Sequence, residues 1–88
     1  MTSKPLLVHG TVRRRGGQAV AGARLMWLDS PLPMPDTAAL SQSDGSFVLG
    51  VPVVGRYRLA CQTDRHGQVQ ADVDVGPSGA SVTLQLPR

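Results

Sequence analysis

The fold is decided by residues 56–75, RYRLACQTDRHGQVQADVDV. Apolar residues take every second position from residue 57 to residue 61 and again from 69 to 75, with charged, polar or small residues between them. A hydrophobic period of two is typical of a β-strand with one buried and one solvent-facing side. Because residues 64–67 supply a turn between the two halves, the stretch predicts two strands joined as a hairpin.

The same alternation recurs on both sides of this hairpin, and each run ends at a glycine or proline turn signal. Three prolines within residues 30–36 exclude regular structure there, because proline lacks an amide donor and pushes the preceding residue towards an extended conformation. Asp44 and Gly45 provide the side-chain acceptor and the positive φ of a hairpin turn. The predicted strands cover residues 6–13, 23–29, 37–42, 46–49, 56–63, 68–75 and 81–86. They predict an all-β fold, a seven-stranded antiparallel β-sandwich of Greek-key type.

One face of each predicted strand is assigned to the core. The residues expected to point inward are Val8, Val12, Leu25, Trp27, Phe47, Leu49, Tyr57, Leu59, Val69, Val73, Val75, Val82 and Leu84. Inward residues must face one another in the hairpin, which places Leu59 opposite Val73 and Arg58 opposite Asp74. An outer-face ion pair worth about 0.2–1 kcal/mol follows from this register. Cys61 alternates with core residues, so we expect an inert buried thiol.

Length and composition indicate one domain. A chain of 88 residues with 41% hydrophobic and 17% charged residues supports one core and is too short for two. We therefore expect residues 6–88 to form a single domain and residues 1–5 a flexible N-terminal tail. The single cysteine excludes an intramolecular disulfide, and no apolar run approaches the roughly 18 residues of a membrane-spanning helix. No signal-peptide pattern is recognisable, which leaves the compartment open.

Four segments carry a family resemblance: residues 8–12, 17–25, 43–47 and 51–59. Their most distinctive stretches are GQAVAGAR, SDGSF and GRYRL. Together they resemble the carboxypeptidase regulatory-like domains of the transthyretin-like sandwich superfamily. The resemblance implies a transthyretin-like fold and a non-catalytic accessory domain, often secreted or in the cell envelope, used for docking or spacing. The chain departs from the family at Val53 and Val54, where a proline commonly precedes the glycine.

Catalytic and metal chemistry lack the residues they need. His9 invites comparison with the hydroxyisourate hydrolases, transthyretin-related enzymes with a histidine on the first strand, but those enzymes end in a Tyr-Arg-Gly-Ser tail and this chain ends LQLPR. Two histidines, one cysteine and dispersed aspartates show no metal-ligand spacing. No Gly-x-Ser-x-Gly elbow is present for Ser-His-Asp catalysis. We therefore expect no enzymatic activity, no metal and no cofactor.

The charged residues fit structural roles. The net charge is +3, with eight arginines spread along the chain and only three aromatic residues, all at core positions, so we expect no nucleic-acid binding. The run Arg13–Arg15 would suit phosphate or an acidic partner, but a solvated charge run at a hairpin tip is the favoured interpretation. Asp36, Asp44 and Asp64 lie in separate turns, and the hairpin accounts for Asp44 better than calcium does.

Apolar residues that the core does not use suggest a contact surface. Met26 and Leu28 are expected on the outer face of the second strand, and Leu32 and Met34 follow in the proline loop. A contiguous apolar patch of several hundred Å² usually marks a partner surface. We therefore predict a module for protein docking or spacing, whose candidate surface is Arg24, Met26, Leu28, Leu32 and Met34.

Two alternatives belong to other functional classes. A carbohydrate-binding sandwich would display exposed aromatic residues, whereas Trp27 is expected inward, and an enzyme of the hydroxyisourate hydrolase type would depend on His9. The expected partner is another protein or the rest of a multidomain parent chain, and we expect no membrane insertion. Self-association through an exposed sheet edge stays open.

Overall fold

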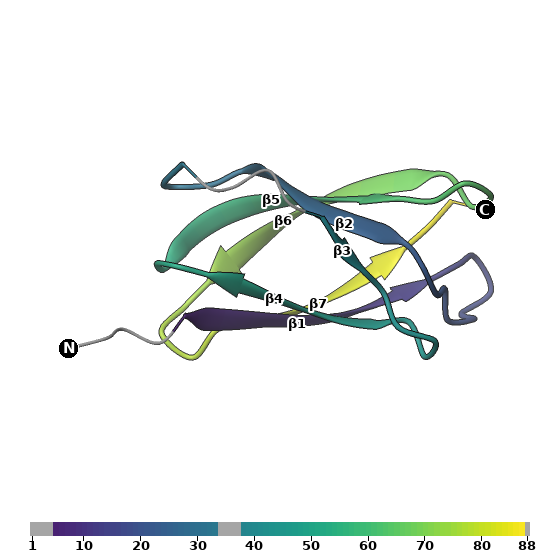
Figure 1. The fold of residues 1–88 in the computed structure, drawn as a ribbon, viewed down its shortest axis with the longest axis horizontal. Helices are drawn as coiled ribbons and strands as arrows, with labels where there is room; N and C mark the ends of the chain where they lie inside the picture. Colours follow the sequence, from purple (N-terminus) through teal and green to yellow (C-terminus); the bar gives the residue numbers. More distant parts are fainter. Residues whose placement is uncertain (1–4, 34–37, 88) are drawn as a thin grey trace.

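In the computed structural model, which describes residues 5–33 and 38–87, all regular structure of the described residues is β-strand. The strands are β1 (Leu6–Arg13), β2 (Arg24–Asp29), β3 (Ala39–Leu40), β4 (Ser46–Val51), β5 (Gly55–Gln62), β6 (Gln68–Val75) and β7 (Ala80–Gln85). They form two sheets, ordered β4-β1-β7 and β3-β2-β5-β6, which pack as two layers (Figure 1). The predicted all-β sandwich is confirmed. Residues 1–4, most of the predicted tail, lie outside the described residues, as does the start of the strand predicted at 37–42.

One strand pair departs from the antiparallel arrangement that we predicted. β1 pairs antiparallel with β4 but parallel with β7, where Val8 lies opposite Ala80. The three-stranded sheet is therefore mixed (Figure 1). Antiparallel order is imposed on strands joined by a tight turn. β1 and β7 are the first and last strands of the chain, so no turn between them imposes it.

The hairpin β5–β6 forms as predicted, but its register is two residues away from the expected one. Leu59 lies opposite Ala71 and not Val73. A shift of two residues keeps every side chain on its own face, so alternation alone cannot fix the register. The turn decides it, because the Thr63 amide donates to the Gly67 carbonyl at 3.1 Å and closes a loop of residues 63–67.

The core lies between the two sheets. Every residue that we predicted to point inward is either buried or packs against the buried cluster. Cys61 is fully buried, and this burial raises the pKa of its thiol. Val20 and Val51 also fill the core. Neither residue was predicted to lie in the core. Val20 belongs to the β1–β2 connection, and Val51 lies in the two residues by which β4 extends beyond its predicted end.

The tightest packing in the three-stranded sheet is at Gly10, in the middle of β1. Phe47 on β4 lies opposite Gly10, and its ring covers the glycine. A Cβ atom on residue 10 would overlap the Phe47 ring and lie 2.7 Å from the Val82 carbonyl oxygen on β7. Glycine is therefore required here for space.

Ser41 joins the two connections by which the chain first crosses between the sheets, from β1 to β2 and from β3 to β4. Its hydroxyl donates to the Val20 carbonyl at 2.7 Å and accepts the Ala23 amide at 2.9 Å. Its main chain adds two bonds, from the Gly22 amide to the Ser41 carbonyl at 2.9 Å and from the Ser41 amide to the Ala23 carbonyl at 3.0 Å. Ser41 is only 5% exposed, so these four bonds are shielded from water.

Replacing Gly10 with alanine is expected to lower the free energy of unfolding by about 1–3 kcal/mol, because the added methyl must displace the Phe47 ring or the β7 backbone. Gly76→Ala is the matched control, since a Cβ there meets nothing within 4 Å, and it should change the value by less than about 0.5 kcal/mol. Urea denaturation followed by Trp27 fluorescence measures both variants. Equal effects would contradict the packing described for Gly10.

Replacing Ser41 with alanine is expected to cost about 1–3 kcal/mol, because the Ala23 amide and the Val20 carbonyl lose their buried partner. Ser81→Ala, at an exposed position of β7, serves as the control and should cost less than about 0.5 kcal/mol. A Ser41→Ala variant as stable as the control would show that the junction contributes nothing to folding.

Candidate interaction surface

The candidate surface lies along β2 and the loop that follows it. Arg24 and Met26 are half-buried, whereas the side chains of Leu28 and Leu32 are 48% and 45% exposed. Met26 pairs with Ala60 of β5 on the outer face, and Leu28 is the extra residue of a β-bulge that gives β2 one residue more than β5. Met34 lies outside the described residues. Four of the five predicted residues therefore follow one another along this side of the molecule.

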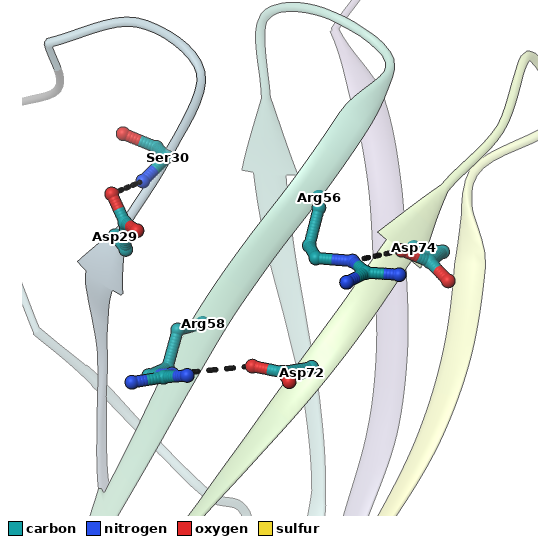
Figure 2. A network of polar contacts seen from close by, with 6 residues as sticks. All are labelled: Asp29, Ser30, Arg56, Arg58, Asp72 and Asp74. Carbon is teal, nitrogen blue, oxygen red and sulfur yellow. Dashed lines mark hydrogen bonds and ion pairs between the residues drawn. The ribbon is translucent and has the colours of Figure 1, made fainter.

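The loop after β2 is anchored to the start of β5. A Cβ atom on Gly55 would stand 2.6 Å from Pro31 Cγ, so Pro31 rests directly on this glycine. The Asp29 carboxylate accepts the Ser30 amide at 2.9 Å and fixes the direction in which the chain leaves β2 (Figure 2). Leu32 follows within two residues of both contacts and is held at the surface by them.

Leu40 is a surface residue that the sequence reasoning did not single out. It lies opposite Arg24 in the β2–β3 pair, and at 63% it is the most exposed large hydrophobic side chain of the described residues. The sequence placed it on a strand, but only the pairing of β3 with β2 shows that it stands beside Arg24 on the outer face. This pairing is non-local, and alternation carries no signal for it.

Ion pairs cover the part of the same sheet farther from β3. Arg58 Nε donates to Asp72 Oδ1 at 3.2 Å, and Arg56 Nε donates to Asp74 Oδ1 at 3.1 Å (Figure 2). The predicted pairing of Arg58 with Asp74 is therefore wrong, since the actual hairpin register brings two arginines opposite two aspartates. The hydrogen bond to Asp74 raises the pKa of Arg56 above its usual value. The sheet thus has an apolar side at β2–β3 and a charged side at β5–β6.

The outer face of the other sheet carries His9. This exposed side chain lies opposite Val48 on β4 and Ser81 on β7, so its cross-strand neighbours are uncharged. Leu7 and Val48 on this face are 44% and 49% exposed. No carboxylate therefore stands across the strands from His9 to orient its imidazole as a base.

Within residues 5–33 and 38–87, no three His, Cys, Asp or Glu side chains gather in a way that would hold a metal ion. In the same part of the chain, no helix has the length and apolar character needed to cross a membrane.

All three aromatic residues pack in the interior. The rings of Trp27 and Tyr57 have centroids 5.1 Å apart at an interplanar angle of 52°. Tyr57 and Phe47 are 1% and 2% exposed, and partly buried Trp27 packs against the same core. None of these rings forms a flat platform on a sheet face.

The sheet edges bear on the predicted self-association. β6 forms one edge of the four-stranded sheet, and β4 and β7 form the edges of the other. Asp72 and Asp74 on the outer side of β6 are exposed charges of the kind that opposes edge-to-edge pairing. Self-association through an edge stays a prediction.

Comparisons with known proteins add no family to this picture. No family model matches the chain, and no curated protein matches its sequence.

The hairpin turn predicted at Asp44 is instead a turn in the crossing from β3 to β4, which lie in different sheets, and this turn explains Asp44, one of the aspartates considered for calcium. Its Oδ1 accepts the Ser46 hydroxyl at 2.6 Å and the Ser46 amide at 2.9 Å. The hydrogen bond from the Ser46 hydroxyl lowers the pKa of Asp44 most, and the bond from the Ser46 amide lowers it further. A carboxylate engaged in this way closes the turn, and among the described residues it belongs to no group of three His, Cys, Asp or Glu side chains that could hold a metal ion.

Asp44→Ala is expected to lower the melting temperature at neutral pH, and its difference from the wild type should shrink in acid. Because folding lowers the pKa of Asp44, its contribution is fully present above the unfolded pKa and is lost as the pH falls through the folded value. Thermal melts between about pH 7 and pH 2 measure this trend. A difference that stays constant over that range would contradict the role of the ionised carboxylate.

Proposed function

We propose that this chain is a non-catalytic accessory domain that docks another protein, or another part of a longer chain, through the outer side of β2 and β3. The observation that carries the proposal is a docking face formed by Met26, Leu28, Leu32 and Leu40. Three of its leucines expose 45–63% of their surface around a half-buried methionine. About half of each leucine is already buried, so a partner that covers the rest gains about half of the roughly 1.5–3 kcal/mol that full burial provides.

The surroundings of the docking face fit this use. Arg24, opposite Leu40, and the arginine–aspartate pairs of β5–β6 supply a polar border. A partly apolar centre with a charged border is the usual composition of a protein–protein interface. The anchored loop and the β-bulge hold Leu28 and Leu32 in place, so little conformational entropy is lost on binding.

We also propose that the chain belongs to the carboxypeptidase regulatory-like family, with a transthyretin-like Greek-key fold. The stretches that carry the resemblance build the crossings between sheets, where Gly22 adopts a φ of 73° in the β1–β2 connection. At the β4–β5 crossing the Tyr57 hydroxyl donates to the Val53 carbonyl at 2.8 Å. A tyrosine that bonds back to the backbone a few residues upstream recurs at corners of Greek-key sandwiches.

The interior position of Trp27 favours docking over glycan binding, because sugar rings stack on exposed aromatic faces. The uncharged neighbours of His9 likewise favour a binding role over hydrolysis. We therefore prefer the docking hypothesis to both alternatives.

The test is affinity capture with the biotinylated chain as bait in an extract of its own source. A Leu28→Ser/Leu40→Ser bait should lose a partner that the wild type recovers, by about tenfold or more, because the partner can no longer bury the apolar surface of two leucines. The matched control is Leu7→Ser/Val48→Ser, which removes two similarly exposed side chains from the opposite sheet, and it should retain the partner. Loss with the control alone, retention with both variants, or no partner for the wild type would each overturn the proposal.

A further inference from the structure

A cleft of about 590 Å³ lies at one end of the sandwich. One wall is Arg14 with residues 18–22 of the β1–β2 connection, and the other is residues 63–66 of the β5–β6 turn. These segments are more than 40 residues apart in sequence, and both lie at the end of the sandwich where β1 and β5 finish (Figure 1). The cleft therefore exists only in the folded chain.

Both walls contribute cationic groups. Arg14 comes from the first wall and Arg65 from the second, and both are exposed. The only acidic lining residue is Asp64, whose Oδ1 is bound by Arg24 Nη2 at 3.2 Å. Because Asp64 is paired with Arg24, it does not neutralise Arg14 or Arg65. These two arginines therefore give the cleft a net positive charge.

The other acidic residues of the described chain do not line the cleft. Asp72 and Asp74 pair with arginines on the sheet face, and the carboxylates of Asp29 and Asp44 accept hydrogen bonds from Ser30 and Ser46. The three ion pairs recorded in residues 5–33 and 38–87 use Arg24, Arg56 and Arg58, and neither Arg14 nor Arg65. Among the described residues, the arginines without an ion pair are therefore concentrated at this end, where Arg13 and Arg15 flank Arg14.

The walls are held in place before any ligand arrives. The Arg14 amide donates to the Gln18 carbonyl at 2.9 Å, and the Arg14 carbonyl accepts the Gly17 amide at 2.9 Å. These two bonds close the tip of the first wall. In the second wall the Thr63 hydroxyl donates to the Gly67 carbonyl at 2.7 Å and accepts the His66 amide at 2.9 Å. Such preorganisation reduces the entropy lost when a ligand binds.

The lining favours carboxylates as the ligand. Guanidinium groups bind carboxylates through paired, charge-assisted hydrogen bonds, and an open cleft admits an extended peptide. No Phe, Tyr or Trp side chain lines it, and the His66 imidazole is the only ring among its lining residues, so it offers little stacking surface for the bases of a nucleic acid. We infer that this cleft binds an acidic peptide segment, whose carboxylates pair with Arg14 and Arg65.

The probe for this proposal is a fluorescein-labelled peptide of alternating glutamate and serine, titrated with the full chain at about 0.15 M salt, where charges are screened beyond about 8 Å, and followed by fluorescence anisotropy. Arg14→Gln/Arg65→Gln should weaken binding by about tenfold or more, because both charge-assisted contacts are lost. The control Arg56→Gln/Arg58→Gln removes the same charge from the sheet face and should change the affinity less than about twofold. Thermal melts establish that both variants are folded.

Three further probes complete the test. A peptide with glutamine in place of glutamate should not bind, inorganic phosphate should compete only weakly, and a short single-stranded oligonucleotide should bind less tightly than the acidic peptide. Equal weakening by both arginine variants would reduce the effect to net charge and overturn the site. Absence of peptide binding, tighter binding of the oligonucleotide, or full competition by phosphate would overturn the acidic peptide as its ligand. Arg14 and Arg65 belong neither to the docking face nor to its polar border, so the result for Arg14→Gln/Arg65→Gln does not depend on the docking proposal, and the two proposals are tested separately.

Discussion

The buried hydroxyl of Ser41 is the contact on which the arrangement of the two sheets depends. A sandwich of this size must send its chain from one layer to the other several times, and each crossing removes backbone groups from a sheet ladder. Ser41 bonds the first two crossings to each other, through its side chain to Val20 and Ala23 and through its backbone to Gly22 and Ala23. Because a buried polar group without a partner is costly, each crossing stabilises the other. The wall of the basic cleft, residues 18–22, is part of this junction.

The close approach at Gly10 explains how the smaller sheet covers the core with only three strands. The Phe47 ring takes the space that a side chain on residue 10 would occupy. One aromatic side chain therefore fills the part of the core beside both residue 47 and residue 10. β7 then completes the sheet beside β1, in parallel, and brings Leu84 and Leu86 into the core. The last strand of the chain thus closes a sheet that the first strand began.

Period-two alternation predicted most of this fold, because the residues that bury one face of each strand are neighbours of their own strand. It placed β1 at its observed bounds and assigned an inward face that the structure confirms for every predicted core residue. Alternation could not predict the features that depend on which strands pair and in which register. The register of β5 on β6, the parallel partner of β1 and the position of Leu40 beside Arg24 are all settled between strands. The candidate surface was predicted in part for the same reason, since its residues on β2 are local and Leu40 is not.

The basic cleft shows the same division between local and non-local information. The run Arg13–Arg15 is obvious in the sequence and by itself is typical of a solvated turn. Its meaning changes because the fold places Arg65 across a cleft from Arg14 and directs Arg24 to Asp64. The proposed docking face and the proposed cleft then divide the work of recognition, because apolar burial supplies affinity with little dependence on salt. Paired charges, in contrast, orient the partner and accelerate encounter in a way that salt screens. A partner that uses both would carry an apolar patch and an acidic segment, placed to reach the side and the end of one sandwich.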